Sequence, residues 1–393
     1  MQLRYLVLIG ACVTQFTVIG LLFSFGLLFK TFEAEFGWSR TVLSSCSAVA
    51  FLVMGILAIA AGRLSDKYGP KLVLAVSGLL FGLGYALISQ VTQPWHLFVI
   101  FAVSIGLGMS THDVVTLSTI ARWFEGRRGV MTGVVKVGTA VGQVVLPPVM
   151  ALLIVLLGWQ MAVISIGICA TILLISSAMM MTYPEVSTLE VAVQDPPGMS
   201  FRAACRTRLF WRLCLIQFLF FPTLMTVPVH LAVHGMDLGM TAGRAALLLS
   251  VLGAASIAGR LVIGLGADRF GGKRAFILSF IPLIASLLAF ATTTGHLPLF
   301  LVVSLYGFAH GGLFTLVSSV VAEYFGMRAH GSIFGTIVFF GTISGFIGPI
   351  LSGWVFDLLG SYQPTFIGLG LMTCLGLIMA LYLPTSTPID PES

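Results

Sequence analysis

The chain has 393 residues, of which 58% are hydrophobic and only 9% are charged. An ordinary soluble domain carries roughly a quarter of charged residues, so this composition excludes a water-soluble globular protein. The formal net charge of +6 is no evidence for nucleic-acid binding until the basic residues are placed. The six cysteines form no CxxC pair and no cluster with histidines at metal spacing, so we expect neither a metal nor another cofactor.

Apolar segments of about twenty residues recur along the chain, and each is long enough to cross the roughly 30 Å hydrocarbon layer as a helix. Backbone amides in lipid must bond within their own segment, so the predicted fold is an all-α membrane protein with twelve transmembrane helices. The predicted ranges are 4–29, 41–62, 72–90, 96–121, 130–156, 161–182, 209–233, 245–266, 275–293, 298–322, 332–356 and 364–383. No cleavage site follows the first, which we interpret as a retained helix and not a signal peptide.

Basic residues are distributed unevenly between the two sides of the predicted membrane. Fifteen of the twenty Lys and Arg residues fall on one side, and only Lys30, Arg40 and Arg244 fall on the other. The positive-inside rule makes the richer side cytoplasmic. We therefore expect a multi-pass protein with both termini in the cytoplasm, and the short outer loops are typical of a bacterial inner (plasma) membrane.

The chain also repeats itself. The stretch GRLSDKYG at 62–69 matches GLGADRFG at 264–271, and the same offset of 202 residues takes Pro147 to Pro349 and Gly158 to Gly360. We therefore predict two pseudo-symmetric six-helix halves, with the solute site between them near mid-membrane. The predicted organisation is an N-terminal half at 1–182, a cytoplasmic linker at 183–208, a C-terminal half at 209–384 and a cytoplasmic tail at 385–393.

Both copies of this stretch fit the pattern G-x-x-x-D-R/K-x-G and resemble the signature loop of the major facilitator superfamily. The signature residues are Gly62, Asp66, Gly69, Gly264, Asp268 and Gly271. Segments 29–40, 121–129, 228–231 and 256–260 are similar to the monocarboxylate transporter family and its oxalate:formate exchanger relatives. The resemblance implies a bacterial-type facilitator that carries small organic anions, commonly lactate- or pyruvate-like, usually together with a proton.

Arg260 lies inside a predicted helix, where an arginine costs a few kcal/mol unless it faces a cavity or a partner. A guanidinium offers a planar fork that matches a carboxylate. The resemblance implies that Arg260 binds the substrate; the alternative is a permanent ion pair between helices. Ser256 stands where the animal members carry an Asp, and Phe23 aligns with their helix 1 lysine. Gly341 stands where oxalate:formate relatives carry a lysine, so one cation suggests one carboxylate.

Three ionisable residues lie deep in the N-terminal half: His112 and Asp113 in one predicted helix and Lys136 in the next. Asp113 and Lys136 at similar depth predict an ion pair that neutralises both. Alternatively, a buried carboxylate can hold a proton and histidine titrates near neutrality, so all three residues are candidates for proton coupling.

Further candidates for substrate contact are aromatic or histidine side chains in predicted pathway helices. They are Phe23, Tyr306, Phe339 and Phe340 for the apolar end of the substrate, and His112, His310 and Ser256 for its polar end. The alternative for the aromatic residues is plain core packing. The alternative for His310 is a packed, hydrogen-bonded residue.

The reading that fits these observations is a secondary active transporter of small monocarboxylates, coupled to protons and working by alternating access. The alternative is a proton-independent organic anion exchanger, and extrusion of apolar drugs is disfavoured by Arg260. An enzyme is not expected, because neighbouring residues such as His112 and Asp113 point apart on a helix. The expected partners are the organic anion, protons and the lipid bilayer, with no nucleic acid, and a monomer is expected.

Overall fold

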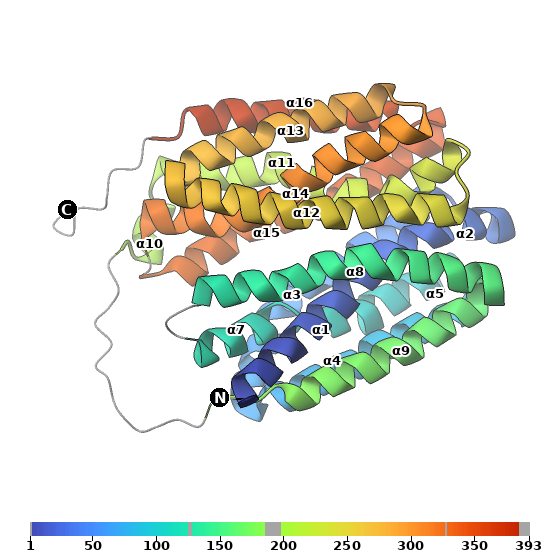
Figure 1. Cartoon of the computed structure of the whole chain (residues 1–393), viewed down its shortest axis with the longest axis horizontal. Helices are drawn as coiled ribbons and strands as arrows, with labels where there is room; N and C mark the ends of the chain where they lie inside the picture. The colour runs from blue at the N-terminus through green and yellow to red at the C-terminus, as the bar shows by residue number, and fades with distance from the viewer. Residues whose placement is uncertain (1, 125–127, 185–197, 327, 385–393) are drawn as a thin grey trace. The chain divides into compact units, whose positions relative to one another are not determined.

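The computed structural model describes residues 2–124, 128–184, 198–326 and 328–384, and these residues are almost entirely helical (Figure 1). Twelve helical segments within these ranges are long and apolar enough to span a membrane, which confirms the predicted all-α fold. Up to the linker the helices are α1 (Gln2–Ser24), α2 (Phe29–Phe36), α3 (Arg40–Tyr68), α4 (Pro70–Leu87), α5 (Pro94–Val99), α6 (Leu107–Met109), α7 (Val114–Trp123), α8 (Arg128–Leu157) and α9 (Trp159–Met180). The linker contains the short helix α10 (Phe201–Cys205), and the chain continues with α11 (Arg208–Asp237), α12 (Ala242–Phe270), α13 (Gly272–Thr292), α14 (His296–Phe325), α15 (His330–Leu359) and α16 (Gln363–Leu381).

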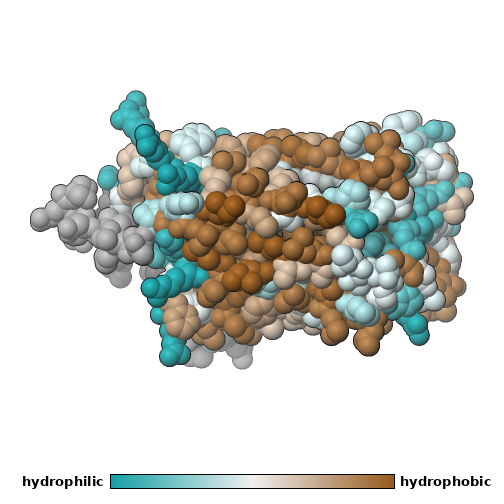
Figure 2. Space-filling view, turned by 90° about the horizontal axis from the view of Figure 1, so that it is seen from above, coloured by the Kyte–Doolittle hydropathy of each residue, from teal (hydrophilic) through white to brown (hydrophobic). Residues whose placement is uncertain are grey.

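Hydrophobic side chains are exposed over much of the surface. Figure 2 shows them gathered over the middle of one face, with hydrophilic side chains toward both ends. Val155, Leu265 and Leu297 are each at least 70% exposed. Such a surface would cause aggregation in water and is suited to a lipid environment.

The chain divides into two compact units. Unit 1 comprises Met1–Glu185, Thr226–Ala254 and Pro349–Gly360, and unit 2 comprises Val186–Met225, Ala255–Gly348 and Ser361–Ser393. Unit 1 therefore contains the first six spans together with parts of α11, α12 and α15. The predicted domain boundaries remain a prediction, and residues 185–197 of the linker and the tail at 385–393 lie outside the described residues.

Inside unit 1, α1 packs along α8 and α4 packs along α9 (Figure 1). Glycines bring the α1 and α8 backbones together. A Cβ on Gly20 would lie 2.7 Å from the backbone of Gly142, and one on Gly138 would lie 2.5 Å from the Cys12 carbonyl oxygen. Small residues let helices approach closely in lipid, and Gly20, Gly138 and Gly142 allow this approach between α1 and α8.

Inside unit 2, α13 packs against α14 and α16. The first turn of α13 is tied to α14, because the backbone N–H of Gly272 donates to the Glu323 carboxylate over 2.8 Å. Phe220 of α11 packs edge to face against Phe280 of α13, with ring centroids 5.5 Å apart. Aromatic packing therefore joins α11 to the same helices.

Two predicted helices differ from the structure. The first does not end at residue 29 but continues through a 3-10 turn at Phe25–Leu28 into α2, because no breaker precedes Gly37. The fourth is not continuous over 96–121: a π-helical segment at Ile100–Gly106 and a tight turn precede α7. In that turn the Ser110 hydroxyl donates to the Leu107 carbonyl over 2.7 Å, so side chains take over part of the backbone bonding.

The internal repeat has a backbone counterpart. Three pairs of glycines separated by 202 residues share a positive φ, a conformation that glycine adopts without strain. They are Gly37 and Gly239 (66° and 87°), Gly69 and Gly271 (82° and 87°), and Gly158 and Gly360 (78° and 64°). Each pair closes a helix at the matching point of its half, so the repeat extends beyond the signature stretch.

Candidate functional site

Arg260 lies well inside α12, ten residues before the helix ends at Phe270, or about 15 Å along the axis. Its side chain is buried, with 9% of the residue exposed. At that depth a guanidinium is costly to place in hydrocarbon. The position therefore requires polar surroundings supplied by the protein or by a solute.

Close contact between α12 and α14 determines what surrounds Arg260. A Cβ on Gly259 would overlap the backbone of Phe308, and one on Gly311 would overlap the backbone of Ser256. The two helices therefore touch backbone to backbone at Ser256 and Gly259, within the turn that precedes the arginine. This contact brings His310 close enough for the Arg260 charge to act on its imidazole.

Two further predicted residues are buried beside this contact. His310 is 1% exposed, and its ring packs between Tyr306 and Phe314, with centroids 5.6 Å and 4.9 Å away. Ser256 is fully buried. Among the described residues, neither the Ser256 hydroxyl nor either ring nitrogen of His310 has a hydrogen-bond partner.

The aromatic candidates do not form one group. The Tyr306 hydroxyl donates to the Thr223 carbonyl over 2.9 Å, so that polar atom is used in packing. Phe340 packs edge to face on Trp211 at 5.9 Å, and Phe339 is 46% exposed. Phe23 is buried in unit 1, whereas Arg260 belongs to unit 2.

The predicted ion pair in the N-terminal half is present. Lys136 Nζ of α8 lies 2.5 Å from Asp113 Oδ1, just before α7, and His112 Nε2 lies 3.6 Å from the same oxygen. The Asp113 side chain is 42% exposed and the Lys136 side chain 30% exposed, although both lie deep in their spans. The pair is therefore accessible and not sealed in the core.

A buried glutamine that the sequence analysis did not single out completes this network. Gln15 of α1 donates from Nε2 to Asp113 Oδ1 over 2.7 Å, and its Oε1 accepts from Thr139 of α8 over 3.0 Å. The internal repeat could have indicated Gln15, because the offset of 202 residues takes it to Gln217, which is also buried. His112 is held separately, with Nδ1 2.7 Å from the Met109 carbonyl.

The first signature loop makes an ion pair. Asp66 Oδ1 accepts from the Arg122 guanidinium over 2.6 Å, and Arg122 also lies 4.1 Å over the Tyr183 ring. Gly69 ends α3 with a positive φ, and Gly62 packs against Val114. In the second loop Gly271 adopts the same backbone, and a Cβ on Gly264 would meet open space. The Asp268 side chain lies outside the described residues.

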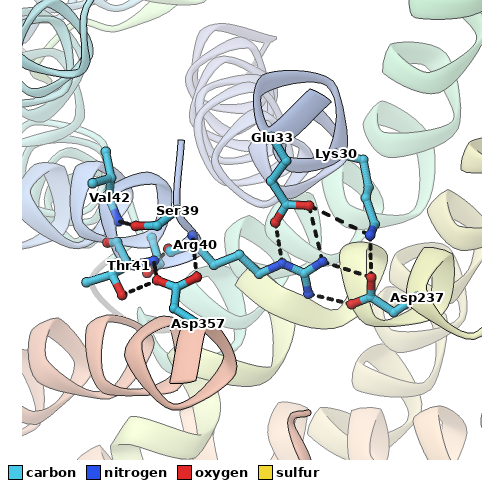
Figure 3. Close-up of polar contacts among 9 residues, drawn as sticks. Lys30, Glu33, Ser39, Arg40, Thr41, Val42, Asp237 and Asp357 are labelled. Atoms are coloured by element: carbon cyan, nitrogen blue, oxygen red, sulfur yellow. Dashed lines mark hydrogen bonds and ion pairs between the residues drawn. The ribbon is translucent and has the colours of Figure 1, made fainter. Parts of the chain in front are cut away.

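A second charged cluster, which we name the Arg40 cluster, comprises Lys30, Glu33, Arg40, Asp237 and Asp357 (Figure 3). All five belong to unit 1. The Arg40 guanidinium, with only 2% of the side chain exposed, binds both Glu33 of α2 and Asp237 of α11. Lys30 Nζ adds a 2.5 Å contact to Asp237. One buried guanidinium thus joins the end of the first span to the end of the seventh.

The Arg40 cluster also includes the end of α15. The Asp357 carboxylate accepts from the backbone N–H groups of Arg40 and Thr41, each over 2.9 Å (Figure 3). These are the first amides of α3, which have no partner within their own helix and carry its positive dipole end. The neighbouring Phe356 ring lies 3.6 Å from Arg40 Cζ. Positions from both halves of the chain are therefore tied to one residue.

The sequence of the chain is similar to those of known membrane transporters. The sequence profile of the Major Facilitator Superfamily matches residues 11–295 and 235–393. Monocarboxylate transporter 13 of Bos taurus is 26% identical over 396 residues, which cover 98% of this chain and 92% of that protein. Agnestins efflux protein AgnL12 of Paecilomyces divaricatus is also 26% identical, over 391 residues that cover 96% of this chain and 84% of that protein.

A solved structure shows the same fold. A mutant of the nucleoside transporter NupG superimposes with a TM-score of 0.75, covering 98% of this chain and all of that one. The two sequences are only 15% identical, so this likeness concerns the fold alone. It confirms the predicted arrangement of twelve spans.

Replacing Arg40 is expected to destabilise the protein strongly. In Arg40→Gln, Glu33 and Asp237 lose the buried guanidinium and keep only the half-exposed Lys30, so unfolding in detergent should become easier by about 2–4 kcal/mol. Arg244→Gln is the matched control, because Arg244 is exposed on the same side and should shift stability by less than about 0.5 kcal/mol. Equal small effects of both substitutions would show that the Arg40 cluster contributes nothing to stability.

Proposed function

Because the chain belongs to the Major Facilitator Superfamily, and is therefore a secondary transporter, we propose that its solute is a small monocarboxylate of lactate or pyruvate size. The observation that carries this proposal is Arg260, a buried guanidinium midway along a span. Its planar fork suits a carboxylate better than any neutral solute. The resemblance to a monocarboxylate transporter over 98% of the chain supports it.

One carboxylate fits better than two. Gly341 offers no second cation in α15, and a Cβ there would already meet the Gln217 amide at 2.7 Å. Lys136, the other cation deep in a span, is engaged by Asp113. A dicarboxylate would therefore bring a second negative charge to a site at which neither Gly341 nor Lys136 supplies a second cation.

We further propose that Asp113 receives the coupled proton. Protonation of its carboxylate would weaken the contact with Lys136 and leave that ammonium to balance an incoming anion. The 42% exposure of Asp113 gives a proton access to it. Anion and proton would then move together, and His112, 3.6 Å away, is a second acceptor. Exchange of two organic anions without protons is the alternative.

Alternating access requires a closure on each side of the solute site. We assign the outer closure to the Arg40 cluster, because it ties the ends of α11 and α15 to the start of α3. The signature pair Asp66–Arg122 lies on the basic side, which the positive-inside rule makes cytoplasmic. The proposed location is the bacterial inner (plasma) membrane with both termini in the cytoplasm.

Substituting Arg260 is expected to abolish transport of monocarboxylates. In proteoliposomes with an inward acid gradient, kcat/KM for radiolabelled lactate should fall at least about 100-fold in Arg260→Ala, since a hydrogen-bonded charge is lost. Arg260→Lys retains the charge without the fork, so its loss should be smaller. Arg269→Ala, exposed at the cytoplasmic end of the same helix, should be unaffected. Uptake that is equal in Arg260→Ala and the native protein would remove Arg260 from the site.

The role of the Asp113–Lys136 pair is tested by neutralising both residues. Asp113→Asn with Lys136→Met leaves no unpaired charge, so the double variant should fold and still exchange labelled for unlabelled lactate. It should no longer accumulate lactate when an acid gradient is applied, because the proton acceptor is gone. If the double variant still accumulated lactate fully under the acid gradient, the pair would have a purely structural role. Exchange by the native protein without any accumulation under an acid gradient would favour the anion exchanger.

A further inference from the structure

We propose that His310 determines substrate specificity by hydrogen-bonding the oxygen on the carbon next to the carboxylate. This inference rests on the proposed function, in which Arg260 binds the carboxylate. It adds that the site distinguishes a 2-hydroxy or 2-oxo acid from a plain carboxylic acid of the same length. Arg260 can bind an anion without any contact from His310, so the proposed function and this inference can be tested separately.

The first support is the unsatisfied bonding capacity of the imidazole. His310 is 1% exposed, yet neither ring nitrogen has a hydrogen-bond partner among the described residues. The Leu224 carbonyl lies near enough to attract one N–H but outside hydrogen-bond geometry. Buried polar groups in native proteins are nearly always paired, and leaving one unpaired is costly. A ligand oxygen would supply the missing partner.

The second support is the position of the ring. The backbone contacts at Gly259 and Gly311 place His310 and Arg260 on two closely packed helices, near enough for the Arg260 charge to act on the imidazole. A carboxylate held by Arg260 carries its next carbon within a bond length, so a substituent there falls within reach of a neighbouring side chain. Ser256, one turn before Arg260 and also without a partner among the described residues, borders the same place.

The third support is that the ring is oriented by apolar neighbours. Tyr306 and Phe314 pack on it at 5.6 Å and 4.9 Å, which restricts its rotation without using its nitrogens. A neutral imidazole offers one donor and one acceptor. It can therefore donate to a keto oxygen or accept from a hydroxyl group, and one residue would serve both a hydroxy acid and its oxidised form.

Two other histidines of the C-terminal half differ from His310. In the buried His230, Nε2 lies 3.0 Å from the Pro349 carbonyl, and in the partly exposed His330, Nε2 lies 3.0 Å from the Ser318 carbonyl. Both of these rings have acceptors supplied by the fold.

The test compares lactate with propionate, which has the same carbon chain and carboxylate but lacks the 2-hydroxyl group. In proteoliposomes, native kcat/KM should favour lactate by roughly 10- to 100-fold, the range expected when a buried hydrogen bond is missing. In His310→Met the ratio should collapse to about 1 through loss of lactate transport, with propionate unchanged. His310→Gln, which retains a donor and an acceptor, should restore part of the ratio. His330→Met is the control and should keep the native ratio.

The outcomes separate this inference from the proposed function. Equal transport of both acids by the native protein, abolished by Arg260→Ala, would overturn the role of His310 and leave Arg260 in place. An unchanged ratio in His310→Met would do the same. Failure of the native protein to transport either acid would overturn both proposals. Should His310→Met not fold, inhibition of native lactate uptake by unlabelled propionate decides: inhibition as strong as that by lactate contradicts the inference.

Discussion

A charge inside the hydrocarbon layer costs several kcal/mol unless another group compensates for it, and this cost decides where the chain places its polar side chains. Lys136 is balanced by Asp113 at 2.5 Å, and Arg40 is balanced by Glu33 at the end of the first span and Asp237 at the end of the seventh. Arg260 is buried well inside α12, and its charge reaches the imidazole of His310. The guanidinium charge would stabilise an anion, which is the physical basis of the proposed solute site.

Close helix packing puts these charges in position. Glycines at the α1–α8 contact hold Gln15 against Asp113 and Thr139, and glycines at the α12–α14 contact hold His310 beside Arg260. Side chains of ordinary size would separate these backbones and move the polar groups apart. The glycines at these two contacts therefore determine how closely the polar side chains approach one another.

Much of the fold could be predicted from the sequence because lipid imposes a simple length rule, and the offset of 202 residues revealed the repeat. The pairing of Asp113 with Lys136 followed from equal depth in adjacent helices. The Arg40 cluster could not be found in this way, because its partners Asp237 and Asp357 are 197 and 317 residues away and all lie at helix ends. The break before α7 was also missed, because it depends on local side-chain bonds of Ser110 and His112 to the Leu107 and Met109 carbonyls and no proline marks it.

The central claim, that the solute is a small monocarboxylate, is tested most directly by counterflow in proteoliposomes. Vesicles that contain the native protein and are preloaded with unlabelled lactate should transiently concentrate radiolabelled lactate from outside at equal pH on both sides. Vesicles preloaded with the same concentration of glycerol should not. Counterflow requires no knowledge of the coupling ion, so a positive result supports the claim under either coupling scheme. Equal, low labelling in both preparations of folded protein would contradict it.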